Sequence, residues 1–324
     1  MKILVTGAYG LVGKSLQKVV SRYVFEGNKI CTDHTFIYLS RKDCDLRNNI
    51  QTINFYELHK PDIVIHLASK VGGVYDNLNG NYTFLMDNIK INMNIVEACE
   101  KTNVKKLINI LSTCIFPDKN ISYPLTSDQL HNGLPHHSNI GYAYSKRVLH
   151  LASHLLSKRN SIQVINITPT NLYGEYDNYN LQSSHVIPGL IHKTYIAREH
   201  ETDLTVFGSG KAMRQFLYVD DLSRIILQFV NLNLPSNQNE ISVIASPPES
   251  HEISIRGVIE KIISMFDFSG NLIYDMSYSD GQFKKTTNND ELKEYLPDFT
   301  FTPLETGLRN TIDYFIENYI NLRL

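Results

Sequence analysis

The sequence predicts an α/β protein with a doubly wound parallel sheet and a smaller α/β lobe. Two observations carry this prediction. Short apolar runs of strand length alternate with longer amphipathic stretches of helix length through roughly the first half of the chain. Three glycines stand between the first apolar run and the first helical stretch. Alternation of this kind is typical of parallel strands joined by helices that cover both faces of the sheet.

The expected elements follow in chain order. Five short apolar runs are expected as strands of the sheet: residues 2–7, 35–40, 62–69, 106–112 and 161–168. Two amphipathic stretches are expected as long helices: residues 84–100 and 142–158. Residues 171–185 form a polar loop rich in Tyr and Asn, and beyond it the alternation loosens. A shorter αβ region then contains the runs 204–208, 220–230, 240–246 and 253–266.

These runs divide the chain into two units. Residues 1–170 are expected to form the sheet domain, and a segment at about 215–245 is expected to return to it. Residues 171–214 and 246–324 are expected to form the smaller lobe. A chain of 324 residues is long enough for two modest domains of this kind.

Charge and cysteine content narrow the classes of function. The formal net charge is −2 and no basic stripe occurs, which argues against a nucleic-acid partner. No apolar run approaches the ~20 residues of a membrane-spanning helix, and glycine breaks the N-terminal run too early for a signal peptide. The four cysteines form no Cys-x-x-Cys pair, so neither a zinc site nor a disulfide framework is indicated. We expect a reducing, cytoplasmic setting.

The three glycines of the first turn, Gly7, Gly10 and Gly13, are spaced GxxGxxG. Glycine lets the backbone turn tightly and approach a pyrophosphate, which then binds at the N-terminus of the following helix. Because the loop follows an opening strand and precedes a helix, it predicts a dinucleotide site of the Rossmann type. A plain turn between strand and helix would not require three glycines.

The residues around the second strand indicate which dinucleotide binds. An NAD site places a carboxylate on the ribose 2′-hydroxyl about 20 residues beyond the loop, and Asp33 stands at roughly that distance. However, Asp33 precedes the strand, whereas ligands bind at the carboxyl ends of strands. That end carries Ser40, Arg41 and Lys42, whose hydroxyl and cations suit a 2′-phosphate. The sequence therefore favours NADP(H).

The pattern Tyr-x-x-x-Lys occurs three times, beginning at Tyr38, Tyr56 and Tyr142. Only the third opens a long helix, where i,i+4 spacing puts Tyr142 and Lys146 on one face. It also follows the fourth strand, whose end carries Ser112. A tyrosine hydroxyl can protonate a ketone oxygen as hydride arrives, and a serine hydroxyl can bond the same oxygen. The lysine ammonium is expected to lower the pKa of the phenol.

The glycine loop, the serine and the Tyr-x-x-x-Lys pair resemble the extended short-chain dehydrogenase/reductases that act on nucleotide sugars. Further segments are similar to the GDP-L-fucose synthase family: STCIFP, HNGLPHHSNIGYAYSKR, PTNLYG, SSHVIPGLIHK, MRQFLYVDDL and SDGQFKKT. The likeness runs from residue 2 to the C-terminal YLPDFTFTP, essentially the whole chain. It implies conversion of GDP-4-keto-6-deoxy-D-mannose to GDP-L-fucose, by inversion at C3 and C5 and then reduction at C4 with NADPH.

The same resemblance implies a role for Cys114, which by itself is as readily a small buried hydrophobic residue. C3 and C5 are both α to the C4 ketone, so inversion passes through enolates and needs a base on one face and an acid on the other. The resemblance implies Cys114 as the base and His185 as the acid. An unperturbed thiol and imidazole have pKa values of about 8.5 and 6.5. Ser112 and Tyr142 are expected to stabilise the enolate oxygen as well.

The resemblance also implies the binding residues. The cofactor is expected to contact Gly7, Tyr9, Gly10, Leu11, Val12, Gly13, Ser40, Arg41, Asp45, Leu46, Ala68, Tyr142, Lys146, Pro169, Asn171, Leu172 and His185. The lobe is expected to bind the GDP-sugar substrate through Lys193, Phe207, Arg214 and Asp280. Arg214 and Lys193 are expected on the pyrophosphate, and Asp280 on a sugar or ribose hydroxyl. Phe207 stands where the family usually has Trp, so it lacks the indole N–H donor.

Two other functions remain open on the residues alone. A nucleotide-sugar 4-epimerase, 4,6-dehydratase or 4-reductase is the first, although a dehydratase is expected to carry Asp-Glu where this chain has Cys114 and Ile115. A non-catalytic NADP-binding protein is the second, although such proteins tend to lose the Tyr or the Lys.

Metal binding and assembly complete the expectations. His131, His136 and His137 lie in one polar loop, but no Cys or acidic residue stands at ligand spacing beside them, so a structured loop is preferred and no metal is expected. The resemblance implies a homodimer that pairs the helices expected at 84–100 and 142–158.

Overall fold

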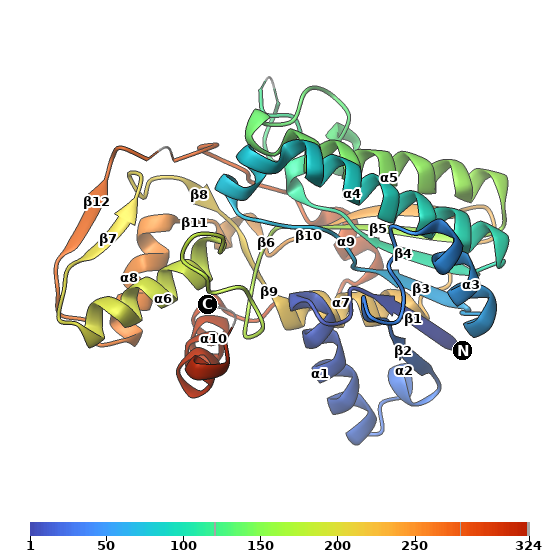
Figure 1. Ribbon diagram of the computed structural model, residues 1–324, viewed down its shortest axis with the longest axis horizontal. Coiled ribbons are helices and arrows are strands. Elements are labelled where there is room, and N and C mark those ends of the chain that lie inside the picture. Colours follow the sequence, from blue (N-terminus) through green and yellow to red (C-terminus); the bar gives the residue numbers. More distant parts are fainter. Residues whose placement is uncertain (120, 279, 323–324) are drawn as a thin grey trace.

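A six-stranded parallel sheet forms the centre of the molecule (Figure 1). The computed structural model describes residues 1–119, 121–278 and 280–322. The strands of the sheet are β1 (Lys2–Thr6), β2 (Thr35–Tyr38), β3 (Ile63–His66), β4 (Lys106–Ile110), β5 (Gln163–Pro169) and β10 (Glu240–Ala245). Their order is β10-β5-β4-β3-β1-β2, and all neighbouring strands are parallel. The predicted fold class is confirmed.

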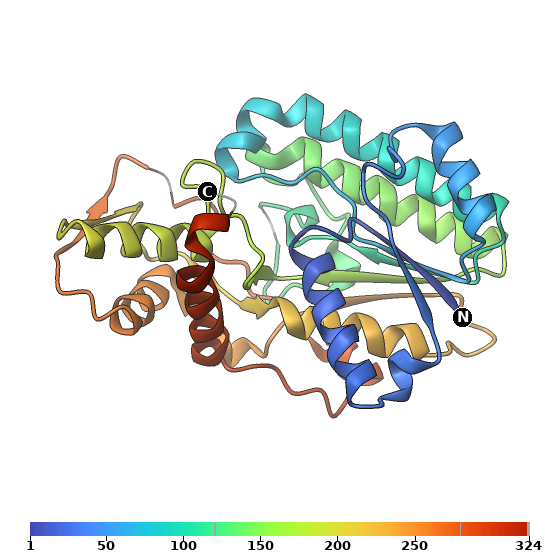
Figure 2. The same cartoon turned by 60° about the horizontal axis from the view of Figure 1, so that its bottom comes forward.

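Helices cover both faces of the sheet (Figures 1 and 2). One face carries α3 (Asn49–His59), α4 (Val74–Lys101) and α5 (Ile140–Arg159), and the other carries α1 (Leu11–Phe25), α2 (Lys29–Thr32) and α7 (Val219–Asn231). In the part of the chain that the structure describes, we find no helix with the length and apolar content that crossing a membrane requires.

Alternating side chains of the strands supply the two cores. Leu4, Val64 and Leu107 pack beneath α3, α4 and α5, whereas Ile3 and Ile63, one position away, pack beneath α1 and α7. All five are at most 2% exposed. Both sets are apolar because the helices exclude water from both faces of a parallel sheet. This explains why the strands appear in the sequence as continuous apolar runs.

The predicted return of the chain to the sheet is visible in β10, which pairs with β5 so that Ile241 lies opposite Ile165. The preceding helix α7 packs on the same face as α1. The end of the sheet domain at residue 170 stays a prediction, because the small ladder of β6 (Asn171–Tyr173) with β9 (Phe216–Tyr218) lies at the crossing between the two units.

The lobe is built from short strand pairs and three helices (Figure 1). Its strands are β7 (Leu204–Phe207), β8 (Met213–Arg214), β11 (Ile253–Ser254) and β12 (Leu272–Asp275), paired as β7 with β12 and β8 with β11. Its helices are α6 (Val186–Glu199), α8 (Ile255–Met265) and α10 (Leu304–Asn318).

Short 3₁₀ turns occur in both units of the chain. They are η1 (Thr113–Ile115), η2 (Ser127–Gln129), η3 (His137–Asn139), η4 (Glu249–His251) and η5 (Tyr319–Asn321).

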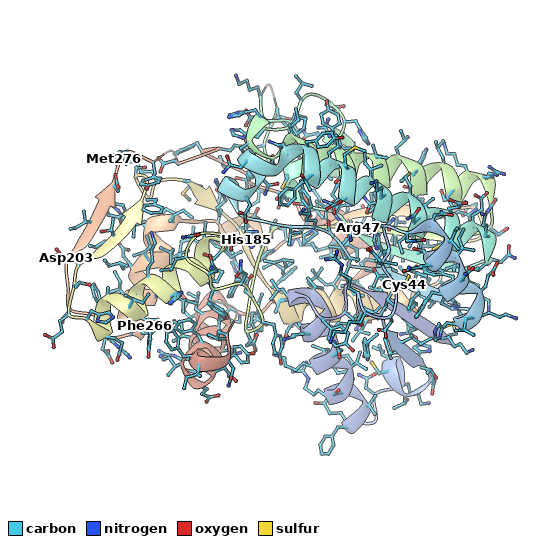
Figure 3. The ribbon with its side chains drawn as sticks, viewed as in Figure 1. Cys44, Arg47, His185, Asp203, Phe266 and Met276 are labelled. Atoms are coloured by element: carbon cyan, nitrogen blue, oxygen red, sulfur yellow. The ribbon has the colours of Figure 1, made fainter. Side chains whose placement is uncertain are left out.

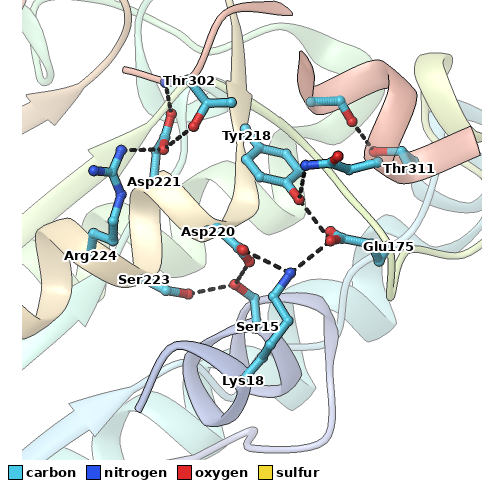
Figure 4. Close-up of polar contacts among 12 residues, drawn as sticks. Ser15, Lys18, Glu175, Tyr218, Asp220, Asp221, Ser223, Arg224, Thr302 and Thr311 are labelled. Carbon is cyan, nitrogen blue, oxygen red and sulfur yellow. Dashed lines mark hydrogen bonds and ion pairs between the residues drawn. The ribbon is translucent and has the colours of Figure 1, made fainter. Parts of the chain in front are cut away.

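The segment that begins with α9 (Asp290–Tyr295) differs from its predicted place in the lobe. Leu292 is 1% exposed and belongs to the core beneath α1 and α7, and Phe299 and Phe301 pack against the same core. Asp221 on α7 accepts hydrogen bonds from the backbone N–H and the hydroxyl of Thr302, both at 2.7 Å (Figure 4). Apolar contact therefore draws this segment to the sheet before the chain re-enters the lobe at α10.

A buried polar network joins the sheet domain to the lobe (Figure 4). Lys18 on α1 lies 2.6 Å from Glu175, in the loop after β6, and 2.7 Å from Asp220 in the first turn of α7. Ser15 donates to Asp220 and the Tyr218 hydroxyl donates to Glu175, each at 2.7 Å. Both carboxylates belong to residues less than a tenth exposed. The Lys18 ammonium therefore neutralises charge that would otherwise be buried alone, and holds the first helix against the lobe.

Candidate active site

Two of the three glycines of the loop, Gly7 and Gly13, stand where only glycine fits. Gly7 has φ +66°, and a Cβ there would lie 2.6 Å from the backbone nitrogen of Ala68. A Cβ on Gly13 would lie 2.4 Å from the carbonyl of Ala8. Gly10 is the N-cap of α1 and offers no side-chain acceptor to the first N–H groups of the helix. Those N–H groups can therefore bind a phosphate at the positive end of the helix.

Other predicted cofactor residues lie around this loop. Tyr9 is 57% exposed beside it, and Leu11 and Val12 form the first turn of α1. Pro169 ends β5, and Asn171 on β6 donates its side-chain amide to the carbonyl of Gln215. Leu172 packs against the core beneath α1 and α7.

The carboxyl end of β2 carries the predicted 2′-phosphate site. Ser40 donates to the carboxylate of Asp43 twice, from its hydroxyl at 2.6 Å and its backbone N–H at 3.0 Å. Arg41 and Lys42 are exposed beside this turn. Asp45 pairs with both nitrogens of the Arg47 fork at 3.0 and 2.7 Å, and these bonds lower the pKa of its carboxyl to about 2. The edge thus presents an ordered turn with two exposed cations.

Leu46 follows this turn and is 8% exposed, in the core on the α4 face of the sheet. Its carbonyl accepts a 2.8 Å hydrogen bond from the side-chain amide of Asn94. The bond fastens the predicted adenosine edge to α4.

A hydroxyl and a thiol stand together after β4. Ser112 is the N-cap of η1, and its Oγ lies 3.0 Å from the Sγ of Cys114 and accepts from the Cys114 backbone N–H at 3.3 Å. Both side chains are half-buried. The tight η1 turn places these two groups, two residues apart, on the same side. A half-buried thiol with a hydroxyl partner is suited to exchanging a proton.

Tyr142 and Lys146 lie in the first half of α5, as the spacing predicts. Lys146 is 2% exposed, and its Nζ donates to the carbonyl of Ile110 at 2.7 Å. Burial lowers the pKa of Lys146 to about 8, against a smaller opposite effect of Cys114. Cys114 also acts on the pKa of Tyr142. These couplings show that the residues from β4 and α5 form one cluster.

The pKa of Tyr142 is raised in this structure, not lowered as we expect from the spacing to Lys146. Burial raises the pKa of the phenol, Cys114 adds to the increase, and a hydrogen bond with Ser69 opposes it. The Lys146 ammonium is bound to a backbone carbonyl and lies 5.9 Å from the centroid of the tyrosine ring. Tyr142 is consequently neutral at pH 7, which is the form that donates a proton.

A buried polar chain beneath the cluster was not anticipated from the sequence. Thr6 at the end of β1 bonds His66 Nδ1 at 2.9 Å, and His66 Nε2 bonds the Asn92 carbonyl oxygen at 3.0 Å. Asn92 donates in turn to the backbone carbonyl of Ser145, next to Lys146. Burial lowers the pKa of His66 to about 3, so the imidazole is neutral. The chain links the glycine loop to the catalytic helix.

His185 comes from the polar loop that leads from the sheet domain to the lobe (Figure 3). It is the N-cap of α6, and just over half of its side chain is exposed. The nearby Asp177 carboxylate raises the pKa of His185 against the opposing effect of burial. Of the predicted catalytic residues, it alone lies outside the segment that runs from β4 to the end of α5.

Two of the four predicted substrate residues meet each other. The Lys193 ammonium lies 3.4 Å from the centroid of the Phe207 ring, and Tyr278 stacks on that ring with centroids 3.9 Å apart. Since both partners lie within 4 Å of the centroid, they occupy opposite faces of the ring. The face predicted to cover a sugar is therefore in contact with a protein group in this structure.

Arg214 and Asp280 also have protein partners. Arg214 donates to the carbonyls of Met213 and Gln282, both at 2.6 Å. Asp280 accepts from the Ser209 N–H and hydroxyl, both at 2.6 Å. These bonds tie the strand β8 and the turn after β7 to the segment at 280–283. The roles of all four residues toward a substrate stay predictions.

Comparison with known proteins places this arrangement in a family. Residues 3–245 match the NAD dependent epimerase/dehydratase family. The chain belongs to this family. It is 42% identical to GDP-L-fucose synthase of Dictyostelium discoideum over 99% of this chain and 97% of that protein, and 40% identical to a probable GDP-L-fucose synthase of Drosophila melanogaster over 99% of both.

Among solved members of the epimerase/dehydratase family, the crystal structure of a GDP-L-fucose synthetase from Naegleria fowleri bound to NADP is similar throughout. Its TM-score is 0.91 at 40% identity, over 100% of this chain and 95% of that one. The family predicted from the motifs is confirmed.

Proposed function

We propose that this chain is a GDP-L-fucose synthase, which converts GDP-4-keto-6-deoxy-D-mannose to GDP-L-fucose with NADPH. The observation that carries the proposal is the hydrogen-bonded Ser112–Cys114 pair in one cluster with Tyr142 and Lys146. A reductase alone needs the serine, tyrosine and lysine but no thiol. Identity of 42% with a GDP-L-fucose synthase over nearly the whole chain supports the proposal.

Epimerisation comes first in the proposed sequence. The Cys114 thiolate takes the proton from a carbon next to the C4 ketone, and the electrons move onto the ketone oxygen. Ser112 and Tyr142 donate hydrogen bonds to that oxygen and stabilise the enolate. The His185 imidazolium then gives its proton to the other face of the carbon, which inverts the centre. The cycle runs once at C3 and once at C5.

Reduction at C4 uses the same oxygen site. The residues of the glycine loop fit a dinucleotide, since Gly7 and Gly13 leave room for close approach of a pyrophosphate. Bound NADPH supplies the hydride for C4. Tyr142 gives its phenolic proton to the ketone oxygen, and Lys146 holds the positive charge beside it. In the lobe, Arg214 and Lys193 bind the GDP pyrophosphate, Phe207 covers the sugar and Asp280 binds a hydroxyl.

Two substitutions separate the half-reactions. Tyr142→Phe removes the proton donor for C4, so we expect little NADPH oxidation while deuterium from D₂O still enters C3 and C5, more slowly because one oxyanion donor is lost. Cys114→Ser removes the base, so we expect exchange to collapse. Hydride transfer then continues and yields a 6-deoxy sugar without inversion. Mass spectrometry of the sugar and absorbance of NADPH measure the two steps.

The wild-type protein distinguishes this proposal from its alternatives in the same assay. A 4-reductase would oxidise NADPH without incorporating deuterium. A retained-cofactor 4-epimerase or a 4,6-dehydratase would not consume NADPH. A non-catalytic binding protein would do neither. If Cys114→Ser forms GDP-L-fucose at the wild-type rate, the thiol is a packing residue and the assignment of the base is wrong.

We also propose that the protein works as a homodimer in the cytoplasm. The outer faces of α4 and α5 expose Tyr82 and Met86, and Leu151 and Leu155, at i,i+4 spacing. Pairing these faces between two copies would cover them. The four cysteines are free thiols, and three of them are buried, which suits a reducing compartment. Fractionation of cells with a specific antibody tests the compartment.

A further inference from the structure

The loop between β6 and α6 is held in one shape by its own side chains. Asn178 donates to the hydroxyl of Ser183 at 2.9 Å. The Asn180 side chain accepts from the backbone N–H of Gln182 and from the N–H and hydroxyl of Ser183. A Cβ on Gly73, at the start of α4, would lie 3.1 Å from the Ser183 carbonyl, so α4 packs against the far side of the loop. The asparagines therefore fix where the loop ends.

The two ends of this loop bring a carboxylate to a histidine. Asp177 stands at the beginning and His185 at the end, and the Asp177 Oδ1 lies 4.0 Å from the His185 Nδ1. The Asp177 side chain is only 5% exposed. Its Oδ1 accepts from the backbone N–H of Asn178 at 2.7 Å, whereas its Oδ2 is buried and finds no hydrogen-bond partner within the described ranges.

A buried carboxylate with an unused oxygen is costly unless a positive group compensates it. The charged lysine Lys18 lies against Glu175 and Asp220 and makes no ion pair with Asp177 in the described part of the chain. The basic side chain that pairs with Asp177 in the described part of the chain is His185. Just over half of the His185 side chain is exposed.

We propose that Asp177 is a positioning residue that keeps His185 protonated as the acid of the epimerisation. This inference rests on the proposed function and adds a residue to it. Asp177 touches neither substrate nor cofactor, and it acts through His185 alone. The Asp177 carboxylate orients the imidazole through Nδ1, which leaves Nε2 to carry the proton toward the sugar.

The proton balance of the two inversions explains why His185 would need the Asp177 carboxylate beside it. Each inversion moves one proton from carbon to Cys114 and one from His185 to carbon, and leaves a thiol and a neutral imidazole. Since two centres are inverted, His185 must take up a proton from water and Cys114 must release one between the two events. A half-exposed imidazole can reach water, and the Asp177 carboxylate makes the uptake more favourable.

The electrostatic surroundings of His185 agree with this role. The Asp177 carboxylate, 4.0 Å away, raises the pKa of His185, while burial opposes it. The helix α4 meets the loop through Gly73 and the backbone of Ser183 and Ser184, which are uncharged. On α6 itself the first charged side chain is Lys193, two turns further on, and it lies against Phe207. Asp177 is thus the charge that acts on His185 in the described structure.

The first test measures the ionisation of His185 without any substrate. The pKa of the imidazole is read by NMR titration of the ring protons, with His185→Gln to assign the resonance. We expect a value above 6.5 in the wild-type protein and a value about 1 unit lower in Asp177→Asn. The control Asp203→Asn removes a carboxylate at the far end of the lobe (Figure 3), where it bonds Asn271, and is expected to leave the value unchanged.

The second test follows deuterium incorporation at C3 and C5 as a function of pH. The rate requires protonated His185, so it falls as pH rises through the pKa of that residue. In Asp177→Asn this fall moves about 1 unit toward lower pH. The variant therefore approaches the wild-type rate at pH below 6 and is about tenfold slower at pH 8. NADPH oxidation by the reduction half-reaction is expected to change much less.

These outcomes are separable from failure of the proposed function. If Asp177→Asn slows exchange equally at every pH, or if its His185 pKa equals that of the wild type, Asp177 is only structural and the inference is wrong. A wild-type His185 pKa at or below 6.5 overturns it even if the variant does not fold. If the wild-type protein neither exchanges protons nor consumes NADPH, the proposed function fails, while the NMR titration still decides the Asp177–His185 pair.

Discussion

At the scale of single residues, the groups of the candidate active site differ in how deeply they are buried, and burial shifts their pKa values. Lys146 is buried and its pKa is lowered to about 8, while burial raises the pKa of Tyr142 beside it. Between them and the solvent, Ser112 and Cys114 share a hydrogen bond at the half-buried end of β4. The proposed base Cys114 is thus half-buried, where it can exchange a proton with solvent, whereas Lys146 is excluded from water.

A second feature at the residue scale is the predicted 2′-phosphate site at the carboxyl end of β2. There the turn at Ser40 leaves the cations Arg41 and Lys42 exposed. Ser40 is bound by Asp43, which leaves Arg41 and Lys42 exposed at the carboxyl end of β2. A 2′-phosphate would meet these cations directly, and the 2′-hydroxyl of NADH would gain little from them. Selectivity between the two cofactors should therefore depend on Arg41 and Lys42.

We predict that Arg41→Ala with Lys42→Ala raises KM for NADPH by about 10- to 100-fold, since charged hydrogen bonds contribute about 1.5–3 kcal/mol. KM for NADH should change less than about threefold. Initial-rate kinetics with both cofactors measure this. The control changes another pair of consecutive cations, Lys158 and Arg159 at the end of α5, to Ala. An equal rise for NADH would contradict the 2′-phosphate assignment.

At the scale of elements, a lysine on strand β4 donates hydrogen bonds to the C-terminal end of helix α7. Lys106 on β4 is 5% exposed, and its ammonium donates to the carbonyls of Phe229, Val230 and Leu232 at the end of α7. The last carbonyls of a helix have no partner within the helix, so this contact satisfies them and favours a cation at the negative end. Burial nevertheless lowers the pKa of Lys106 to about 8.

We predict that Lys106→Met destabilises the protein by about 1–3 kcal/mol at pH 7, because buried carbonyls lose their donor. The pKa of Lys106 is about 8 when folded and about 10.4 when unfolded, so the unfolded chain binds more protons between these values. The contribution of this lysine to stability therefore rises with pH from about 8 to 10.4. The difference in unfolding free energy between wild type and variant should widen over that window.

Urea denaturation at pH 7, 8, 9 and 10 measures this difference. The neighbouring Lys105 is a matched control, since its side chain is 72% exposed and pairs with Asp62 at the surface. Lys105→Met should change stability by less than about 1 kcal/mol. A gap between wild type and Lys106→Met that stays constant with pH would show that the buried ammonium does not titrate as proposed.

At the scale of the whole molecule, the sheet domain and the lobe meet along polar contacts. Lys18 joins Glu175 and Asp220, and Asp221 holds Thr302 (Figure 4). The loop that carries His185, the proposed acid, runs from β6 to α6 and includes Glu175. Because the proposed acid lies on this crossing loop and the base lies on the sheet, the junction sets the distance between them.

The dimer prediction belongs to the same scale. We expect Leu151→Lys with Leu155→Lys to convert a dimer into a monomer, since each substitution places a charge on the proposed apolar interface. The dissociation constant should rise by at least about 100-fold, which corresponds to loss of one or two buried leucines per copy. Light scattering after size exclusion measures the mass.

A matched control uses an exposed apolar pair on another helix. Ile50 and Leu58 on α3 are 71% and 77% exposed, and changing both to Lys should leave the mass unchanged. A wild-type protein that is monomeric at micromolar concentration would contradict the proposed assembly.

The sequence alone determined the parallel sheet, the glycine loop and the pairing of Tyr142 with Lys146. Each depends on spacing within a few residues: apolar runs of strand length, three glycines in one turn, or i,i+4 positions on one helix. Gly7 shows the limit of this local information. Its place in the loop is visible in the sequence, whereas the backbone of Ala68 that excludes a side chain comes from 61 residues away.

Only the tertiary structure decided the contacts between distant segments. The chain of Thr6, His66 and Asn92 joins three elements, and Asp177 meets His185 only because the asparagines of their loop fold it back. The same holds for the pKa of Tyr142, which spacing predicted to fall and burial raises. Burial and the distance between charges are properties of the packed molecule, since they depend on which segments exclude water from a group and not on its neighbours in the chain.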